Sequence, residues 1–208
     1  MDEHRLIVSR SARYFTLGAA AAPEVWFVLH GYGQLASRFL QKFALLDDGT
    51  RQLVAPEALS RFYLDGADKK VGAAWMTRED RLAEIDDTVR YLDALYVQVL
   101  QGVTGTRNVQ VLGFSQGAAA ACRWAALGSS SIDRVILWGG EVPPDLDASL
   151  LKKLPLVFVH GRQDDMITPK IAAVHERRLT EYGITYRMVP FDGGHELNDA
   201  VLRTLAAT

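Results

Sequence analysis

The chain has 208 residues, of which 49% are hydrophobic and 23% charged, a globular composition that excludes a disordered chain, a collagen-like repeat or a coiled-coil rod. Lys and Arg number 23 against 25 Asp and Glu, and this even balance predicts no nucleic-acid partner and no attraction to anionic lipid. The single cysteine, Cys122, excludes an internal disulfide and a cysteine-based zinc cluster, and the length fits one domain over residues 1–208.

The amino-terminal residues are charged and lack the apolar run of a signal peptide. No later stretch approaches the roughly 18 apolar residues of a membrane span, so we expect a cytoplasmic protein that does not cross a membrane. Residues 5–17 mix β-branched, aromatic and polar side chains, which favours one or two edge strands. Residues 24–30 form an apolar run that ends at Gly31, as expected of a strand buried on both faces.

Apolar side chains at helical spacing predict a helix over residues 37–46, and a short strand is predicted at 52–55. Residues 56–76 contain proline, glycine and several aromatic side chains, and we expect this segment to be irregular and exposed. Thr77 and Asp80 form a capping-box pattern at the start of a long helix, in which apolar residues recur every three or four positions.

The second half of the chain alternates strands and helices. Strands are predicted at 108–114, 134–138, 156–160 and 184–190, and helices at 116–127, 168–183 and 196–207. Thr168 followed by Pro169 is typical of an N-cap and first helical turn, and Gly183 is typical of a C-terminal cap. Strands and helices that alternate with short connections predict a mostly parallel central sheet covered by helices on both faces.

Residues 113–117, GFSQG, lie between a predicted strand and a predicted helix. In this context the pattern G-x-S-x-G is typical of a nucleophile elbow, a tight turn whose glycines remove Cβ atoms that would clash. The turn exposes the Ser115 hydroxyl at the carboxyl ends of the strands, above a helix N-terminus that favours developing negative charge. The alternative is a serine that only caps a helix, but two further residues in the required chain order favour the nucleophile.

The first of these is an acid after the strand at 156–160. Asp164 and Asp165 are both candidates, and we prefer Asp164 because Asp165 lies three residues before Thr168 and suits the capping of the next helix. The second is His195, on a glycine-rich turn after the last strand. The order serine, aspartate, histidine is the one required when the nucleophile stands on a strand-to-helix elbow.

The remaining histidines are interpreted differently. His30 and His160 each end a buried strand and are interpreted as hydrogen-bonded structural groups, and His175 is expected on the solvent side of a helix.

An acyl-transfer site also needs hydrogen-bond donors for an oxyanion. One candidate is the backbone N–H of Gln116, the residue after the nucleophile, and the other is the N–H of Tyr32 in the turn after the strand at 24–30. Each such donor is worth about 3 kcal/mol at the transition state.

Four motifs, LHGYG (29–33), GFSQGAAAA (113–121), VHGRQD (159–164) and GGHEL (193–197), resemble the α/β-hydrolase superfamily, and more narrowly its phospholipase/carboxylesterase branch, which includes the acyl-protein thioesterases. The resemblance implies an α/β-hydrolase fold and hydrolysis of carboxylic esters or thioesters without a cofactor or metal. It makes Ser115 the nucleophile, Asp164 the orienting acid and His195 the base, and it assigns the Tyr32 and Gln116 amides to the oxyanion hole.

The chain departs from relatives with lipid-modified protein substrates at residues 71–77, so the resemblance does not extend to depalmitoylation. Candidates for an apolar substrate pocket are Phe62, Tyr63, Trp75 and Met76, with ordinary packing as an equal alternative. Only 15 residues, 139–153, stand where larger hydrolases often insert a helical cap. We therefore expect a hydrolase without a cap domain, whose selectivity depends on residues 56–76.

Two other functions compete with ester hydrolysis. A non-catalytic ligand-binding protein on the same scaffold is the alternative from a different class, and the presence of all three triad residues argues against it. Epoxide or halide chemistry normally uses an aspartate at the elbow, where this chain has Ser115. The expected partner is a small-molecule ester or thioester, and the protein is expected to be a monomer or homodimer.

Overall fold

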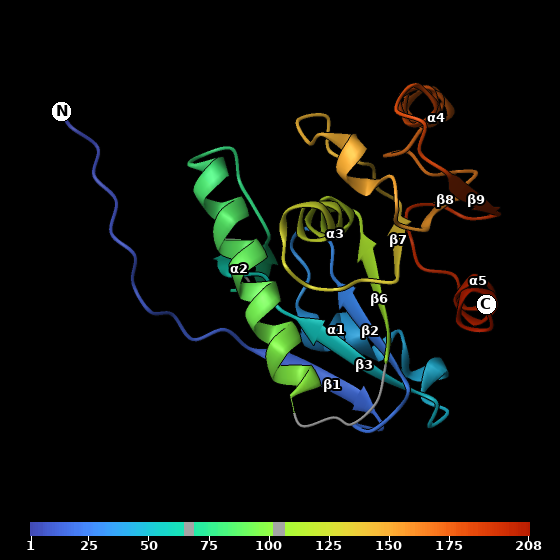
Figure 1. Ribbon diagram of the computed structural model, residues 1–208, viewed down its shortest axis with the longest axis horizontal. Coiled ribbons are helices and arrows are strands. Elements are labelled where there is room, and N and C mark those ends of the chain that lie inside the picture. The colour runs from blue at the N-terminus through green and yellow to red at the C-terminus, as the bar shows by residue number, and fades with distance from the viewer. Residues whose placement is uncertain (65–68, 102–106) are drawn as a thin grey trace.

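Figure 1 shows the computed structural model of the chain, which describes residues 1–64, 69–101 and 107–208. The large sheet contains β1 (Tyr14–Gly18), β2 (Glu24–Leu29), β3 (Arg51–Pro56), β6 (Asn108–Phe114), β7 (Arg134–Trp138), β8 (Leu156–Gly161) and β9 (Tyr186–Phe191). Its strand order is β1-β3-β2-β6-β7-β8-β9. Only β1 runs antiparallel to its neighbour, and all other neighbours are parallel.

The central strands are apolar on both faces because each face packs against a hydrophobic core. In β2, Val25, Phe27 and Leu29 point into one core, whereas Trp26 and Val28 point into the other. Successive side chains of a strand point to opposite faces, so this continuous apolar run fits a strand covered on both sides.

Helices supply the cover. They are α1 (Ala36–Gln41), α2 (Arg81–Leu100), α3 (Gln116–Leu127), α4 (Pro169–Glu181) and α5 (Asp199–Ala206). On one face α2, α3 and α4 contribute Leu92, Ala121 and Leu179 to the core that holds Phe27. On the other face α1 and α5 pack into the core that holds Trp26. The predicted α/β fold with helices on both faces is therefore confirmed.

The connection between β7 and β8 is short. Within the described residues it contains the 3₁₀ helix η2 (Ala148–Leu151) and no cap domain. A second 3₁₀ helix, η1 (Ala44–Leu46), follows α1, so the helix predicted over 37–46 is interrupted after Gln41. In the described part of the chain, no helix has both the length and the hydropathy needed to cross a bilayer.

The prediction that residues 56–76 are irregular is wrong for two stretches of the segment. β4 (Ser60–Tyr63) and β5 (Val71–Ala74) pair antiparallel in a separate two-stranded sheet, while residues 65–68 lie outside the described residues. Both strands are four residues long, which is too short for a clear hydrophobic period. β5 lies close to the turn after β2, because a Cβ added at Gly72 would be 2.5 Å from the carbonyl oxygen of Gly33.

The capping box predicted at Thr77 is also wrong. α2 begins at Arg81, and its N-cap Asp80 has a left-handed backbone (φ 45°) and makes no side-chain cap hydrogen bond. Thr77 instead uses its amide and hydroxyl to bind the carboxylate of Glu84. A contact from the preceding loop to the first turn of α2 has replaced the predicted cap.

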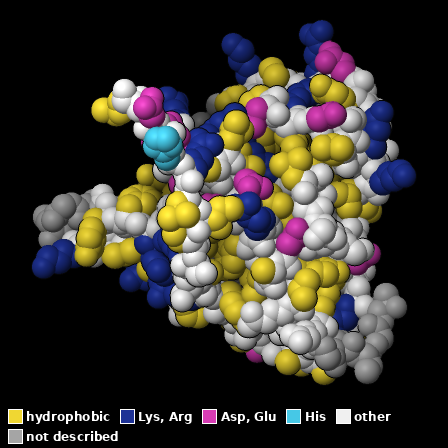
Figure 2. Space-filling view, turned by 60° about the vertical axis from the view of Figure 1, so that its left-hand side comes forward, with side chains coloured by type: hydrophobic (Ala, Val, Ile, Leu, Met, Phe, Trp, Pro, Cys, Tyr) yellow, Lys and Arg dark blue, Asp and Glu magenta, His cyan; other side chains and the backbone are white. Residues whose placement is uncertain are grey.

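At the amino terminus, the predicted edge strand is confined to β1. The residues before it are exposed and have no regular secondary structure, and Figures 1 and 2 show this segment projecting from the body. On the face shown in Figure 2, basic and acidic side chains are interspersed with apolar ones. The even charge balance of the composition is therefore also seen locally on this face.

Candidate active site

Ser115 lies at a sharp turn between β6 and α3. Its backbone has φ 54° and ψ −118°, and its amide donates a 2.9 Å hydrogen bond to the carbonyl of Trp138 in the neighbouring strand. A positive φ is uncommon for a residue other than glycine and is found at strained functional turns. The local geometry is that of the predicted elbow.

The glycines on either side of Ser115 allow β6 and α3 to approach closely. A Cβ added at Gly113 would lie 2.2 Å from the carbonyl oxygen of Gly117, and one at Gly117 would lie 2.3 Å from that of Leu29. Both distances are below any tolerable contact with backbone, so only glycine fits at these two positions.

Asp164 and His195 are joined by a hydrogen bond. The distance between His195 Nδ1 and Asp164 Oδ2 is 2.9 Å, and the Asp164 side chain is almost fully buried. The other carboxylate oxygen accepts the amides of Met166 and Ile167 at 2.8 and 2.9 Å. Asp165, the competing candidate, is exposed. The structure therefore brings His195 together with Asp164, as predicted.

The same hydrogen bonds explain the ionisation of Asp164. Burial alone would raise the pKa of its carboxyl, but hydrogen bonds from the Ile167 amide, His195 and the Met166 amide hold that pKa below its usual value. Asp164 is therefore ionised at neutral pH, where it can orient the His195 imidazole and stabilise its protonated form.

His195 lies next to the elbow. Its ring centroid is 5.0 Å from that of Phe114, the residue before Ser115. A Cβ added at Gly139 would be 3.0 Å from His195 Cε1, so the glycine after β7 makes room for the imidazole. Among the hydrogen bonds of the described residues, none joins the Ser115 hydroxyl to His195. Catalytic hydrogen bonds are often long before a substrate binds.

The two predicted oxyanion donors also lie near Ser115. Gln116 is the first residue of α3, so its N–H has no acceptor within the helix. The turn that carries Tyr32 approaches the elbow closely, because a Cβ added at Gly31 would be 3.3 Å from the Cβ of Ser115. This turn is held by a 2.9 Å hydrogen bond from the amide of Gly33 to the carbonyl of Ala73 in β5.

The side chain of His30 supports the same turn through its ring nitrogens. Its buried ring places Nδ1 2.8 Å from the carbonyl of Gly31, and Nε2 accepts the amide of Ala58 at 3.1 Å. Burial lowers the pKa of His30, which favours the neutral ring that this arrangement requires. The structural interpretation of His30 is therefore confirmed. His175, in contrast, was expected to face solvent, but its side chain is only 14% exposed and contacts Glu141.

The four candidate substrate-pocket residues have different environments. Tyr63 is exposed, and the ring of half-buried Phe62 lies 5.1 Å from that of Tyr32. Trp75 is 3% exposed and donates its indole N–H to the carbonyl of His30 at 2.7 Å. This burial in the core favours ordinary packing, the alternative considered for Trp75, over contact with a substrate. Met76 is half-buried.

The side chain of Gln116 is a contact that sequence reasoning missed. It bridges α3 to the end of β5, with Oε1 accepting the Trp75 amide at 3.0 Å and Nε2 donating to the Met76 carbonyl at 2.7 Å. The only available signal was its position inside the GFSQG motif, which does not reveal the partner.

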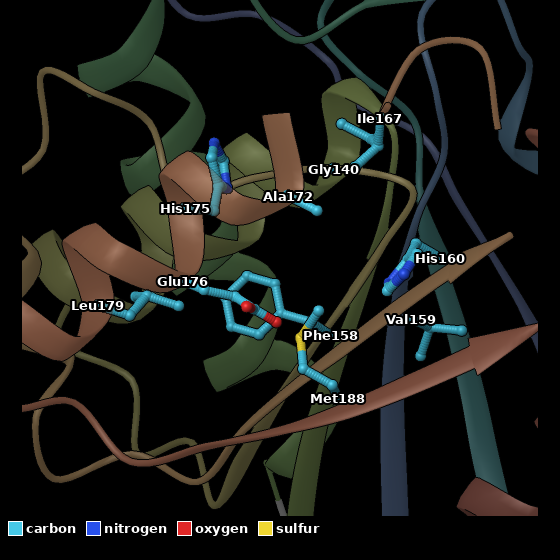
Figure 3. Close-up of a pocket in the computed structure, with 10 residues that line it drawn as sticks. All are labelled: Gly140, Phe158, Val159, His160, Ile167, Ala172, His175, Glu176, Leu179 and Met188. Atoms are coloured by element: carbon cyan, nitrogen blue, oxygen red, sulfur yellow. The ribbon is translucent and has the colours of Figure 1, made fainter. Parts of the chain in front are cut away.

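A pocket adjoins the segments that carry Gly139 and Asp164. It opens between α4 and the strands β8 and β9, and residues around it include Gly140, Phe158, His160 and Ile167. His160, expected to be a hydrogen-bonded structural group, instead borders this pocket (Figure 3). Among the hydrogen bonds of the described residues, none involves its side chain. Within the described residues, no group of three or more His, Cys, Asp or Glu side chains is arranged to hold a metal ion.

The sheet order, the elbow after β6 and the helices on both faces define an α/β-hydrolase fold. The sequence model that describes phospholipases and carboxylesterases matches residues 18–207. The chain therefore belongs to the phospholipase/carboxylesterase family and is an enzyme of the esterase type. No curated protein matches the sequence at a significant level.

Solved structures show the same fold over nearly the whole chain. The carboxylesterase from Mesorhizobium loti is 20% identical, with a TM-score of 0.74 and coverage of 98% of this chain and 96% of that one. Acyl-protein thioesterase 2 from Zea mays is 19% identical, with a TM-score of 0.70 and coverage of 95% and 99%. Esterase PE8 is 23% identical, with a TM-score of 0.70 and coverage of 95% and 97%.

Proposed function

We propose that the protein is a serine hydrolase that cleaves carboxylic esters, with thioesters as a second substrate class, through Ser115, His195 and Asp164. The observation that carries the proposal is the 2.9 Å hydrogen bond between His195 Nδ1 and Asp164 Oδ2, next to the elbow that bears Ser115. With the Nδ1 proton directed at Asp164, the neutral imidazole keeps Nε2 as its basic nitrogen. The proposed substrate is a small-molecule ester in the cytoplasm, and residues 1–208 act as one domain.

In the proposed reaction His195 accepts the Ser115 proton as Oγ attacks the ester carbonyl. The Tyr32 and Gln116 amides donate hydrogen bonds to the tetrahedral oxyanion, and ionised Asp164 stabilises the imidazolium. Protonated His195 then gives its proton to the leaving alcohol or thiol. Water, activated by the same histidine, attacks the acyl-enzyme, and the proton returns to Ser115 as the carboxylic acid leaves.

A fluorophosphonate probe tests the proposal, because it forms a covalent bond only with an activated serine. We expect stoichiometric labelling at Ser115, located by peptide mass spectrometry, and hydrolysis of p-nitrophenyl acetate. Ser115→Ala should abolish labelling and lower kcat by several orders of magnitude with unchanged folding. Ser37→Ala, a change of a half-buried serine in α1, is the matched control and should keep both activities.

The result that would contradict the proposal is a folded protein that neither reacts with the probe nor turns over any ester. Such a protein would instead be a non-catalytic ligand-binding member of the fold.

A further inference from the structure

Trp138, the last residue of β7, makes hydrogen bonds to two separate parts of the proposed active site. β7 lies between β6, which ends at the elbow of Ser115, and β8, which leads to Asp164 (Figure 1). The carbonyl of Trp138 accepts the amide of Ser115 at 2.9 Å. Its indole N–H donates to the carbonyl of Glu196, the residue after His195, at 2.8 Å. One residue therefore binds the backbone at the nucleophile and the backbone beside the base.

Packing fixes the side chain of Trp138 in one position. It is 1% exposed and lies in the same core as Phe114 and Phe191. Its ring centroid is 5.7 Å from that of Phe191, the last residue of β9 before the loop that carries His195. A buried indole N–H needs an acceptor, and a rigid ring gives the hydrogen bond a fixed direction. The core therefore sets the position of the Glu196 carbonyl.

Two hydrogen bonds hold the loop on either side of His195. Before the histidine, the carbonyl of Gly193 accepts the amide of Gln163 at 2.9 Å. After it, the carbonyl of Glu196 accepts the indole of Trp138. The first bond joins two backbones, whereas the second comes from a side chain. The second bond can therefore be removed by a substitution that leaves the sequence of the loop intact.

Given the proposed function, we infer that Trp138 is a positioning residue, whose indole N–H sets the place of His195 relative to Ser115. Proton transfer between these two side chains requires them to come within hydrogen-bond reach. A displacement of about 1 Å lowers the rate about 100-fold. Because Trp138 acts through the loop of His195, loss of its N–H should slow the reaction and leave KM largely unchanged.

Trp138→Phe tests this role, because it keeps the backbone carbonyl and an aromatic ring but removes the indole N–H. We expect kcat for p-nitrophenyl acetate to fall about 10–100-fold, with KM within about twofold of the wild-type value. The second-order rate of fluorophosphonate labelling at Ser115 should fall by a similar factor, since labelling depends on the same base.

Trp124→Phe is the matched control. Trp124 is equally buried, and its indole donates a hydrogen bond of the same 2.8 Å length to Asp93, away from the proposed active site. Both variants lose one indole N–H and part of one buried ring, so urea denaturation should show a loss of stability in each. A merely structural role of Trp138 would give the two variants equal kinetics, whereas a positioning role slows Trp138→Phe alone.

Benzothienylalanine in place of Trp138 removes the N–H without leaving a cavity, because sulfur replaces nitrogen in a ring of nearly the same shape. It should slow turnover and labelling as Trp138→Phe does, and it serves as the test if the phenylalanine variant does not fold. Wild-type rates in either folded variant of Trp138, or an equal fall in Trp124→Phe, would overturn the positioning role.

The two proposals can fail separately. If wild type is labelled at Ser115 while the variants of Trp138 react at the same rate, the positioning role fails and the proposed function stands. If wild type shows neither labelling nor turnover, the proposed function fails and the positioning role fails with it.

Discussion

The side chain of Gln116 binds the backbone of Trp75, with its Oε1 atom accepting the Trp75 amide at 3.0 Å. The same side chain donates to the carbonyl of Met76, so both polar ends of one amide hold the segment after β5. Gln116 also carries one of the proposed oxyanion donors on its backbone. One residue therefore connects the start of α3 with the strand that supports the Tyr32 turn.

We expect Gln116→Ala to reduce stability and rate together. Two hydrogen bonds are lost, which lowers the free energy of unfolding by about 2 kcal/mol. The backbone amide remains, so ester turnover should fall without being abolished. Urea denaturation and kcat/KM for p-nitrophenyl acetate measure the two effects. Gln98→Ala, which removes one exposed hydrogen bond to Tyr14, is the control and should change neither by much. Equal effects of the two variants would contradict the bridging role.

Asp164→Asn should lower kcat about ten-thousandfold, because an amide cannot hold His195 in the required tautomer. The folded state should survive, since the Asn oxygen can still accept the amides of Met166 and Ile167. Asp165→Asn should stay near wild type, because Asp165 is exposed. Steady-state kinetics with matched circular dichroism spectra decide the assignment. A large loss in Asp165→Asn, or none in Asp164→Asn, would show that the acid is wrongly assigned.

The backbone of Gly161 packs closely against the loop that carries His195. A Cβ there would lie 2.2 Å from the carbonyl oxygen of Gly193 and 2.4 Å from that of Gly194. Gly161→Ala should therefore push the histidine loop away, and a displacement of about 1 Å lowers kcat about 100-fold. In Gly194→Ala the nearest atom would be 3.8 Å away, so activity should persist. The prediction would be contradicted if Gly194→Ala lost activity while Gly161→Ala kept it.

Asp93 contributes stability that depends on pH. Its carboxylate accepts hydrogen bonds from the Trp124 indole and from the amides and hydroxyls of Ser129 and Ser130. Burial would raise the pKa of Asp93, but the hydrogen bonds, led by that of the Ser130 hydroxyl, lower it below 3.8. A lowered native pKa stabilises the fold above the unfolded pKa, and this stabilisation is lost as pH falls through the native value.

Asp93→Asn should therefore destabilise the protein by about 2 kcal/mol at pH 7. The difference from wild type should shrink as pH falls below about 4, because the unfolded carboxyl takes up its proton there, whereas the native one does so only at the lower pH of its depressed pKa. Urea unfolding of both proteins between pH 3 and 7 measures this convergence. A difference that stays constant over the whole range would rule out the charge of Asp93 as the cause.

Cys122 should be unreactive in the folded protein. It is fully buried in α3, and burial raises the pKa of its thiol to about 12. Iodoacetamide at pH 8 should leave the folded chain unmodified and ester hydrolysis intact, because the thiolate is the reactive form. The same reagent should modify Cys122 in urea, as read by mass spectrometry. Rapid modification without unfolding would contradict the burial.

Much of the site was predictable from the sequence because its signals are local. The GFSQG turn requires glycine on both sides of Ser115, and the carboxyl ends of parallel strands meet at one edge of the sheet. An acid after β8 and a histidine after β9 were therefore expected to meet, as Asp164 and His195 do.

The features that the sequence did not predict depend on contacts that no local pattern specifies. Trp75 was a candidate for a substrate pocket with packing as an equal alternative, and the sequence did not show that its indole donates to the carbonyl of His30, 45 residues away. Thr77 resembled a helix cap until its partner proved to be Glu84. His175 lies on a polar helix, and only the loop after β7 brings Glu141 to it. None of these partners has a fixed spacing that a pattern could detect.

The pairing of β2 with β6 has a consequence for the order of events in folding. It joins Glu24 to Asn108, so a long stretch of chain must close before the two strands meet. Tyr32 follows one of these strands and Gln116 follows the other. Non-local parallel pairing forms slowly. The proposed active site therefore cannot form within a local fragment, and we expect a nascent chain to react with esters only after the centre of its sheet has closed.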